Sequence, residues 1–118
     1  MATAVINDRA LGLTVGYAAT SWNAPVTFDQ YAQALSDWTI RAIQRNDETI
    51  GAVFSKDGEV HVSVLPQWRR QWATKGLLRQ LLSPPVKTRI AEGHDYMREI
   101  LIRLGFAEQP DGMFVKEA

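Results

Sequence analysis

Apolar and polar positions alternate through the middle of the chain, which is the pattern of half-buried strands. Polar turn clusters divide the alternation into three segments, residues 38–43, 49–54 and 59–65. In the last segment three valines share one face, so Glu59 and His61 share the other face, because strand side chains alternate. The short connections predict an antiparallel meander of three strands.

Helical spacing replaces this alternation on both sides of the meander. Thr27 and Gln30 form a capping-box pattern at the start of a short segment with apolar residues at helical intervals. Leucines form an apolar stripe over residues 77–82. Ser83-Pro84-Pro85 ends this helix, because proline cannot continue its hydrogen-bond ladder.

The last third of the chain predicts one more strand, one more helix and a hairpin. Residues 86–90, "VKTRI", follow a helical crossover, so we expect them to pair parallel to residues 59–65. A helix is expected over Asp95–Leu104, with Gly105 in a left-handed C-terminal cap and a hairpin over residues 106–115. The predicted order is strand, helix, three strands, helix, strand, helix and hairpin. This order indicates a single α+β domain over residues 1–118, with one mixed sheet flanked by helices.

Composition excludes several classes of site. The chain has 118 residues, is 46% hydrophobic, and contains no cysteine and only two histidines. A disulfide framework and a thiolate zinc site are therefore excluded, and we expect no metal site. The chain shows neither a signal-peptide pattern nor an apolar run long enough for a membrane span, so we expect a soluble protein without a membrane partner.

Charge is balanced over the chain but not along it. The formal net charge is zero, yet residues 69–89 contain six Lys/Arg and no acidic residue. This basic tract indicates a local anionic partner, and a solvated basic face is the alternative explanation.

The order of the elements and three stretches resemble the GCN5-related N-acetyltransferase (GNAT) superfamily over residues 27–115. "EVHVSVLPQW" followed by "RRQWATKGLLRQLL" resembles the family's acetyl-coenzyme A motif, in which a strand runs into Arg/Gln-x-x-Gly-x-Gly/Ala and a helix. "VKTRIAEGH" resembles the next strand, and Leu104-Gly105-Phe106 corresponds to the Leu-Gly-Phe of the closing segment. "VLPQWRRQW" also resembles small acetyltransferase-like proteins of phages. The resemblance implies a GNAT-like sheet, an antiparallel meander joined to a parallel strand pair.

The same resemblance implies acetyl-coenzyme A as co-substrate. A helix N-terminus offers amide donors and a positive dipole end, and neighbouring cations suit a diphosphate. Backbone groups of the preceding strand would hold the pantetheine arm. The residues expected to bind the cofactor are Val64, Leu65, Arg69, Arg70, Gln71, Trp72, Ala73, Thr74, Lys75 and His94.

Two positions depart from the family's pattern. Trp72 stands where the motif has its first glycine, and its indole either packs on the sheet or covers the amides that would bind phosphate. Leu101 stands where many members place a tyrosine that protonates the leaving thiolate, and Tyr96 lies five positions earlier.

Acetyl transfer to an amine needs a base and donors for the oxyanion of the tetrahedral intermediate. Glu59 and His61 are the candidate catalytic residues; a turn-flanking charge and a half-buried sheet histidine are the structural alternatives. His94 falls where the family often has asparagine.

Three functions follow from these observations. The first is an acetyl-coenzyme A dependent N-acetyltransferase with an unknown amine acceptor. The second is a catalytically degenerate module that binds an assembly partner, such as one in a phage particle. The third is nucleic-acid binding by the basic tract, with Trp68 and Trp72 as stacking platforms. We expect the protein in the cytoplasm of a bacterium or a phage-infected cell, or in a virion, as a monomer or a homodimer.

Overall fold

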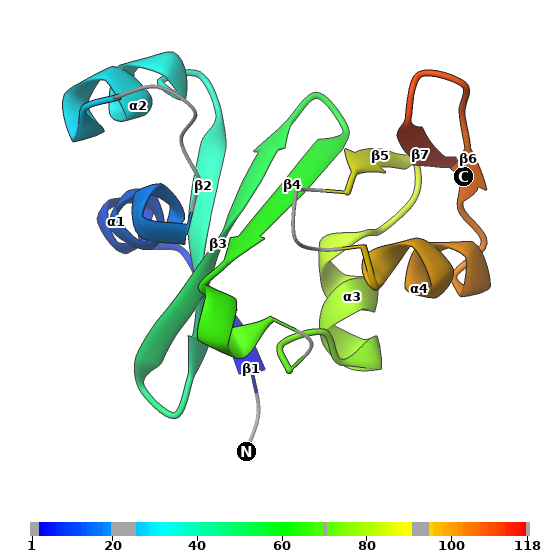
Figure 1. The fold of residues 1–118 in the computed structure, drawn as a ribbon, viewed down its shortest axis with the longest axis horizontal. Coiled ribbons are helices and arrows are strands. Elements are labelled where there is room, and N and C mark those ends of the chain that lie inside the picture. Colours follow the sequence, from blue (N-terminus) through cyan, green and yellow to red (C-terminus); the bar gives the residue numbers. More distant parts are fainter. Residues whose placement is uncertain (1–2, 20–25, 70, 91–94, 118) are drawn as a thin grey trace.

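The chain folds into one seven-stranded mixed sheet with helices on both faces (Figure 1). The structure is a computed structural model that describes residues 3–19, 26–69, 71–90 and 95–117. The strands are β1 (Thr3–Ile6), β2 (Thr39–Arg45), β3 (Glu48–Lys56), β4 (Glu59–Val64), β5 (Val86–Arg89), β6 (Ala107–Glu108) and β7 (Met113–Lys116). Their order is β1-β2-β3-β4-β5-β7-β6, and only the β4–β5 pair is parallel within the described residues. The predicted meander and the predicted parallel strand are both confirmed.

The helices are α1 (Arg9–Ala19), α2 (Phe28–Ala34), α3 (Lys75–Leu81) and α4 (Met97–Arg103), with a 3-10 turn at Pro66–Trp68. The capping box at α2 is confirmed, because Thr27 and Gln30 exchange both side-chain to backbone hydrogen bonds. Gly105 has a positive φ of 96° after α4, as predicted. None of the helices in the described ranges is long and apolar enough to cross a membrane.

The sequence did not predict α1, and this omission is the main correction to the fold. Two glycines and two β-branched residues weaken its intrinsic helix propensity. Tertiary packing compensates, because Gly12 and Gly16 let the helix approach the sheet closely: a Cβ on Gly16 would lie 2.6 Å from the Tyr31 hydroxyl. Asp8 adds an N-terminal cap by accepting a 3.0 Å hydrogen bond from the Leu11 amide.

Two apolar clusters lie on opposite faces of the sheet, and Figure 1 shows the two helix pairs that cover them. The first cluster packs α1 and α2 against β2 and β3, and its buried residues are Leu13, Val15, Tyr31, Ile40, Ala52 and Phe54. The second packs α3 and α4 against the sheet and includes Val53, Val60, Val64, Trp72, Leu78 and Leu101. This second cluster contains the tryptophan that interrupts the glycine pattern.

Candidate active site

β4 presents its polar residues on the face that carries α1 and α2. Val60 and Val64 are buried on the opposite face, in the cluster beneath α3 and α4. Glu59 and His61 therefore share the α1–α2 face, because successive side chains of a strand alternate. Both side chains are only partly exposed, at 28% and 30%.

β4 and β5 start side by side and then separate. Glu59 and Lys87 are Cα partners, and the Lys87 amide donates a 2.9 Å hydrogen bond to the Gly58 carbonyl. No other Cα pair joins the two strands in the part of the chain that the structure describes. The side of β4 that faces β5 is therefore open beyond the start of the strand, except that the Val64 carbonyl accepts from Arg69.

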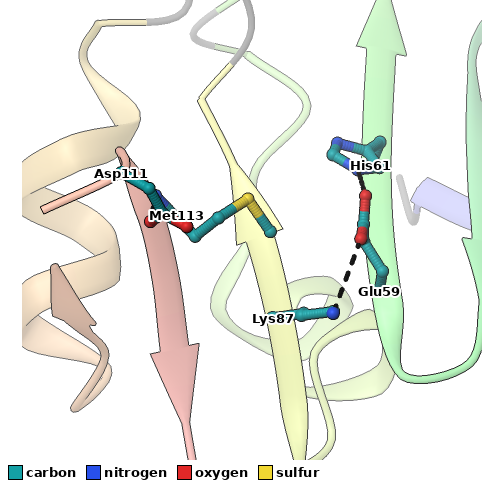
Figure 2. Close-up of polar contacts among 5 residues, drawn as sticks. All are labelled: Glu59, His61, Lys87, Asp111 and Met113. Carbon is teal, nitrogen blue, oxygen red and sulfur yellow. Dashed lines mark hydrogen bonds and ion pairs between the residues drawn. The ribbon is translucent and has the colours of Figure 1, made fainter. Parts of the chain in front are cut away.

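Glu59 and His61 form a hydrogen-bonded pair where the strands separate (Figure 2). His61 Nε2 contacts Glu59 Oε2, and Lys87 Nζ lies 3.9 Å from Glu59 Oε1. The hydrogen bond from His61 holds the pKa of Glu59 below its usual value of 4.5, and the charges of Lys87 and Arg89 lower this pKa further. Glu59 is therefore ionised near neutral pH and accepts the proton that Nε2 carries. This contact leaves the lone pair of a neutral imidazole on Nδ1.

Two hollows border this pair on the same face. An aromatic pocket of about 230 Å³ is lined by Tyr31, Leu35, Trp38, Phe54, His61 and Ser63. A charged groove of about 620 Å³ lies over β5 and β7, and its lining includes Glu59, Lys87, Arg89, Asp111 and Met113. Because His61 borders the pocket and Glu59 borders the groove, the pair lies between them. No group of three or more metal-binding side chains lies together within the described ranges.

The groups predicted to hold the pantetheine arm and the phosphates already have partners in the protein. Arg69 donates to the Val64 carbonyl at 3.2 Å and to the Ala19 carbonyl at 3.3 Å. The Leu65 amide donates to the Ile50 carbonyl, and the Leu65 carbonyl accepts from the Trp68 amide, both at 2.9 Å. In this state Arg69 links the end of β4 to the end of α1.

The remaining predicted cofactor residues surround the start of α3. The Thr74 hydroxyl caps α3 by accepting from the Leu77 amide at 3.2 Å. The Gln71 carbonyl accepts from Arg45 at 3.0 Å, and Ala73 packs against the apolar cluster. Arg70, His94 and the side chain of Lys75 lie outside the described residues.

Trp72 packs into the core beneath α3 and α4, where it is 1% exposed. Its Nε1 donates a 2.9 Å hydrogen bond to the hydroxyl of Tyr96, which precedes α4. The indole also lines a narrow apolar cavity of about 40 Å³, together with Val62 on β4, Thr88 on β5 and Leu101. Of the two orientations that the sequence left open, the structure has the one in which the indole is packed inside. It lies beneath the gap between the separating strands.

Sequence reasoning missed the residues that complete the surroundings of the pair. Trp38 has its ring centroid 5.7 Å from that of His61, and Tyr31 reaches the same pocket from α2. Helical and strand periodicity places each of them on its own element, but carries no signal that the two elements meet at His61. Lys87 had a signal, because the predicted parallel pairing of its strand brings it beside Glu59.

No protein-family model and no curated protein matches the chain. Solved structures match it along nearly the whole length. Ard1 from Thermoplasma volcanium is 15% identical, with 97% of this chain and 95% of that chain covered and a TM-score of 0.65. The ribosomal-protein-S18-alanine N-acetyltransferase from Escherichia coli is 14% identical, with 97% and 91% covered and a TM-score of 0.59.

A third match has a bound cofactor. The PaiA N-acetyltransferase from Thermoplasma acidophilum, solved in complex with coenzyme A, is 10% identical to this chain. The match spans 98% of this chain and 97% of the PaiA chain, with a TM-score of 0.53. At such identities the likeness establishes a shared fold.

Proposed function

The chain has the fold of the GCN5-related N-acetyltransferases, and on this premise we propose that it transfers an acetyl group from acetyl-coenzyme A to an amine. The observation that carries the proposal is the Glu59–His61 pair, which lies where β4 and β5 separate and borders two open hollows. The similar structure with bound coenzyme A supports the choice of co-substrate.

The two side chains of the pair would have different tasks. An amine is protonated near neutral pH and must lose a proton before it attacks an acyl carbon. His61 is the proposed base, because histidine exchanges protons near neutral pH and its Nδ1 is left with a lone pair. Glu59 is the proposed positioning residue: its lowered pKa makes it a weak base but a good acceptor for the imidazole N–H.

The residues present fit the co-substrate in part. When bound, acetyl-coenzyme A supplies the activated acetyl thioester. Beyond the start of β4, its β5-facing edge has no strand pairing among the described residues, and an unpaired strand edge suits the amides of a pantetheine arm. Arg69 fits it only after its guanidinium leaves the carbonyls of Val64 and Ala19, whereas the Trp72 indole is packed in the core and bonded to Tyr96. Arg70, Gln71, Thr74, Lys75 and His94 stay proposed phosphate-side contacts on the strength of the motif alone.

A second function is favoured by the present contacts of Arg69. A guanidinium bonded to the Val64 and Ala19 carbonyls, together with Leu101 at the usual tyrosine position, suits a protein that keeps the fold without the co-substrate. Such a protein would use its open face to bind a partner, and the likeness of "VLPQWRRQW" to phage proteins supports an assembly role.

Calorimetric titration with acetyl-coenzyme A separates the two functions. The enzyme hypothesis expects binding, followed by release of free thiol when amines are added. His61→Ala should lower turnover by about 100-fold or more while the co-substrate still binds. Glu99→Gln is the matched control for Glu59→Gln, because Glu99 is an exposed carboxylate on α4 that pairs with Arg103. No heat with millimolar acetyl-coenzyme A would rule out the enzyme and favour the binding module.

A further inference from the structure

The aromatic pocket is shaped for a large apolar group. Tyr31 and Phe54 meet edge to face, with ring centroids 6.5 Å apart, and Trp38 closes a second side against His61. Its volume of about 230 Å³ is several times the roughly 30 Å³ that one water occupies in the liquid. Burying an apolar side chain of the size of Leu or Phe in such a pocket is favourable.

The charged groove offers charges of both signs at short range from the pair. Glu59 supplies a carboxylate, with the ammonium of Lys87 3.9 Å away. Arg89 borders the same groove and is held against the turn before β7, where it donates a 3.0 Å hydrogen bond to the Asp111 carbonyl. The Asp111 carboxylate is engaged in that turn, because it accepts the Met113 amide at 3.0 Å. Figure 2 shows Lys87 directed toward Glu59, with Met113 at the start of β7 and Asp111 in the turn before it.

We propose that this surface binds a free α-amino acid with a large apolar side chain. The ammonium would lie at Glu59 and His61, the carboxylate at Lys87 and Arg89, and the side chain in the aromatic pocket. A zwitterion matches both signs of charge in the groove, whereas a simple amine or a diamine adds positive charge beside Lys87 and Arg89 and brings no negative charge. Because His61 borders the pocket and Glu59 borders the groove, an amino acid whose ammonium lies at the pair would have the pocket on one side for its side chain and the groove on the other for its carboxylate.

This inference deepens the proposed function by naming its acceptor, and part of it rests on that function. Binding is therefore measured without acetyl-coenzyme A, by amide chemical shifts of the ¹⁵N-labelled full chain. The probes are L-phenylalanine, L-phenylalaninamide and phenethylamine, which differ only at the carboxylate, and glycine, which lacks the side chain. We expect L-phenylalanine to bind about tenfold more tightly than the amide and the amine, as for one charge-assisted contact, and we expect glycine not to bind.

Variants locate the contacts. Lys87→Met should reduce the preference for L-phenylalanine over phenethylamine toward one, and Arg103→Met, an exposed cation on α4, should leave it unchanged. Trp38→Leu should weaken all three aromatic probes alike. Equal binding of L-phenylalanine and phenethylamine to the unaltered protein, or no shift with either at 10 mM, overturns the proposal. Binding of L-phenylalanine without any acetylation would retain this inference and refute the enzyme.

Discussion

Truncation of Trp72 tests the packing beneath the separating strands most directly. The side chain is 1% exposed and donates its N–H to Tyr96, so Trp72→Ala removes both a large apolar contact and a satisfied hydrogen bond. Such a truncation costs about 3–5 kcal/mol, against a total stability of roughly 5–15 kcal/mol for a domain. The existing cavity of about 40 Å³ beside the indole becomes part of a larger void. We expect a variant that folds at low temperature with a strongly reduced unfolding midpoint.

Urea denaturation followed by far-ultraviolet circular dichroism measures this cost. Trp68→Ala is the matched control, because Trp68 lies four residues before Trp72, is only half-buried and has the Arg45 guanidinium 5.6 Å from its ring centre. Loss of that contact should cost about 1 kcal/mol or less. A cost below about 1 kcal/mol for Trp72→Ala, equal to that of the control, would refute the packing described for the indole.

The same variant also reports on the co-substrate. Because the indole is packed in the core, the orientation that leaves the phosphate-binding amides uncovered, we expect Trp72→Ala to bind acetyl-coenzyme A about as tightly as the unaltered chain, despite its lower stability. Tighter binding would mean that the indole obstructs the site.

Three further predictions follow from single contacts. The pKa of Glu59 is lowered in the folded state, so its carboxylate adds stability above the usual value of 4.5 that is lost as pH falls through the lowered value. The difference in urea midpoint between the unaltered chain and Glu59→Gln should therefore shrink between pH 7 and pH 3, and a constant difference contradicts the assignment. Gly16→Ala should unfold at a lower temperature, because the new Cβ would lie 2.6 Å from the Tyr31 hydroxyl. Gly76→Ala is the control: its Cβ would have no atom within 4 Å, so the substitution should be neutral or stabilising by up to about 1 kcal/mol. Thr74→Ala should cost about 1 kcal/mol through loss of the α3 cap, and Thr74→Ser should restore most of it; no loss in thermal denaturation would count against the cap.

Local signals in the sequence predicted those parts of the fold that depend on local chemistry. The Thr27 cap, the strand alternation through β4 and the left-handed Gly105 each require residues within a few positions of one another. α1 was missed because its stability comes from distant residues, as the approach of Gly16 to Tyr31 shows. Propensity within the helix gives no such information.

The candidate site divides in the same way. Alternation along β4 was sufficient to place Glu59 and His61 on one face, and the structure brings their side chains into contact. The packing of Trp72 in the core involves Tyr96, which lies 24 residues later in the chain. The aromatic pocket forms only where α2 meets β4. Neither contact has a local signature in the chain.

Two separate parts of the chain form the aromatic pocket and the charged groove beside the Glu59–His61 pair. α2, β3 and the residue before β2 supply the aromatic pocket, while β5 and the closing hairpin supply the cations and the turn of the charged groove. In the sheet, one register pair joins these parts across β4 and β5. Apolar and ionic selectivity are therefore free to evolve separately. A chimera that exchanges β5 (Val86–Arg89) together with residues 105–117 for those of another protein of this fold should alter which ionic groups are recognised and retain the preference for the apolar side chain.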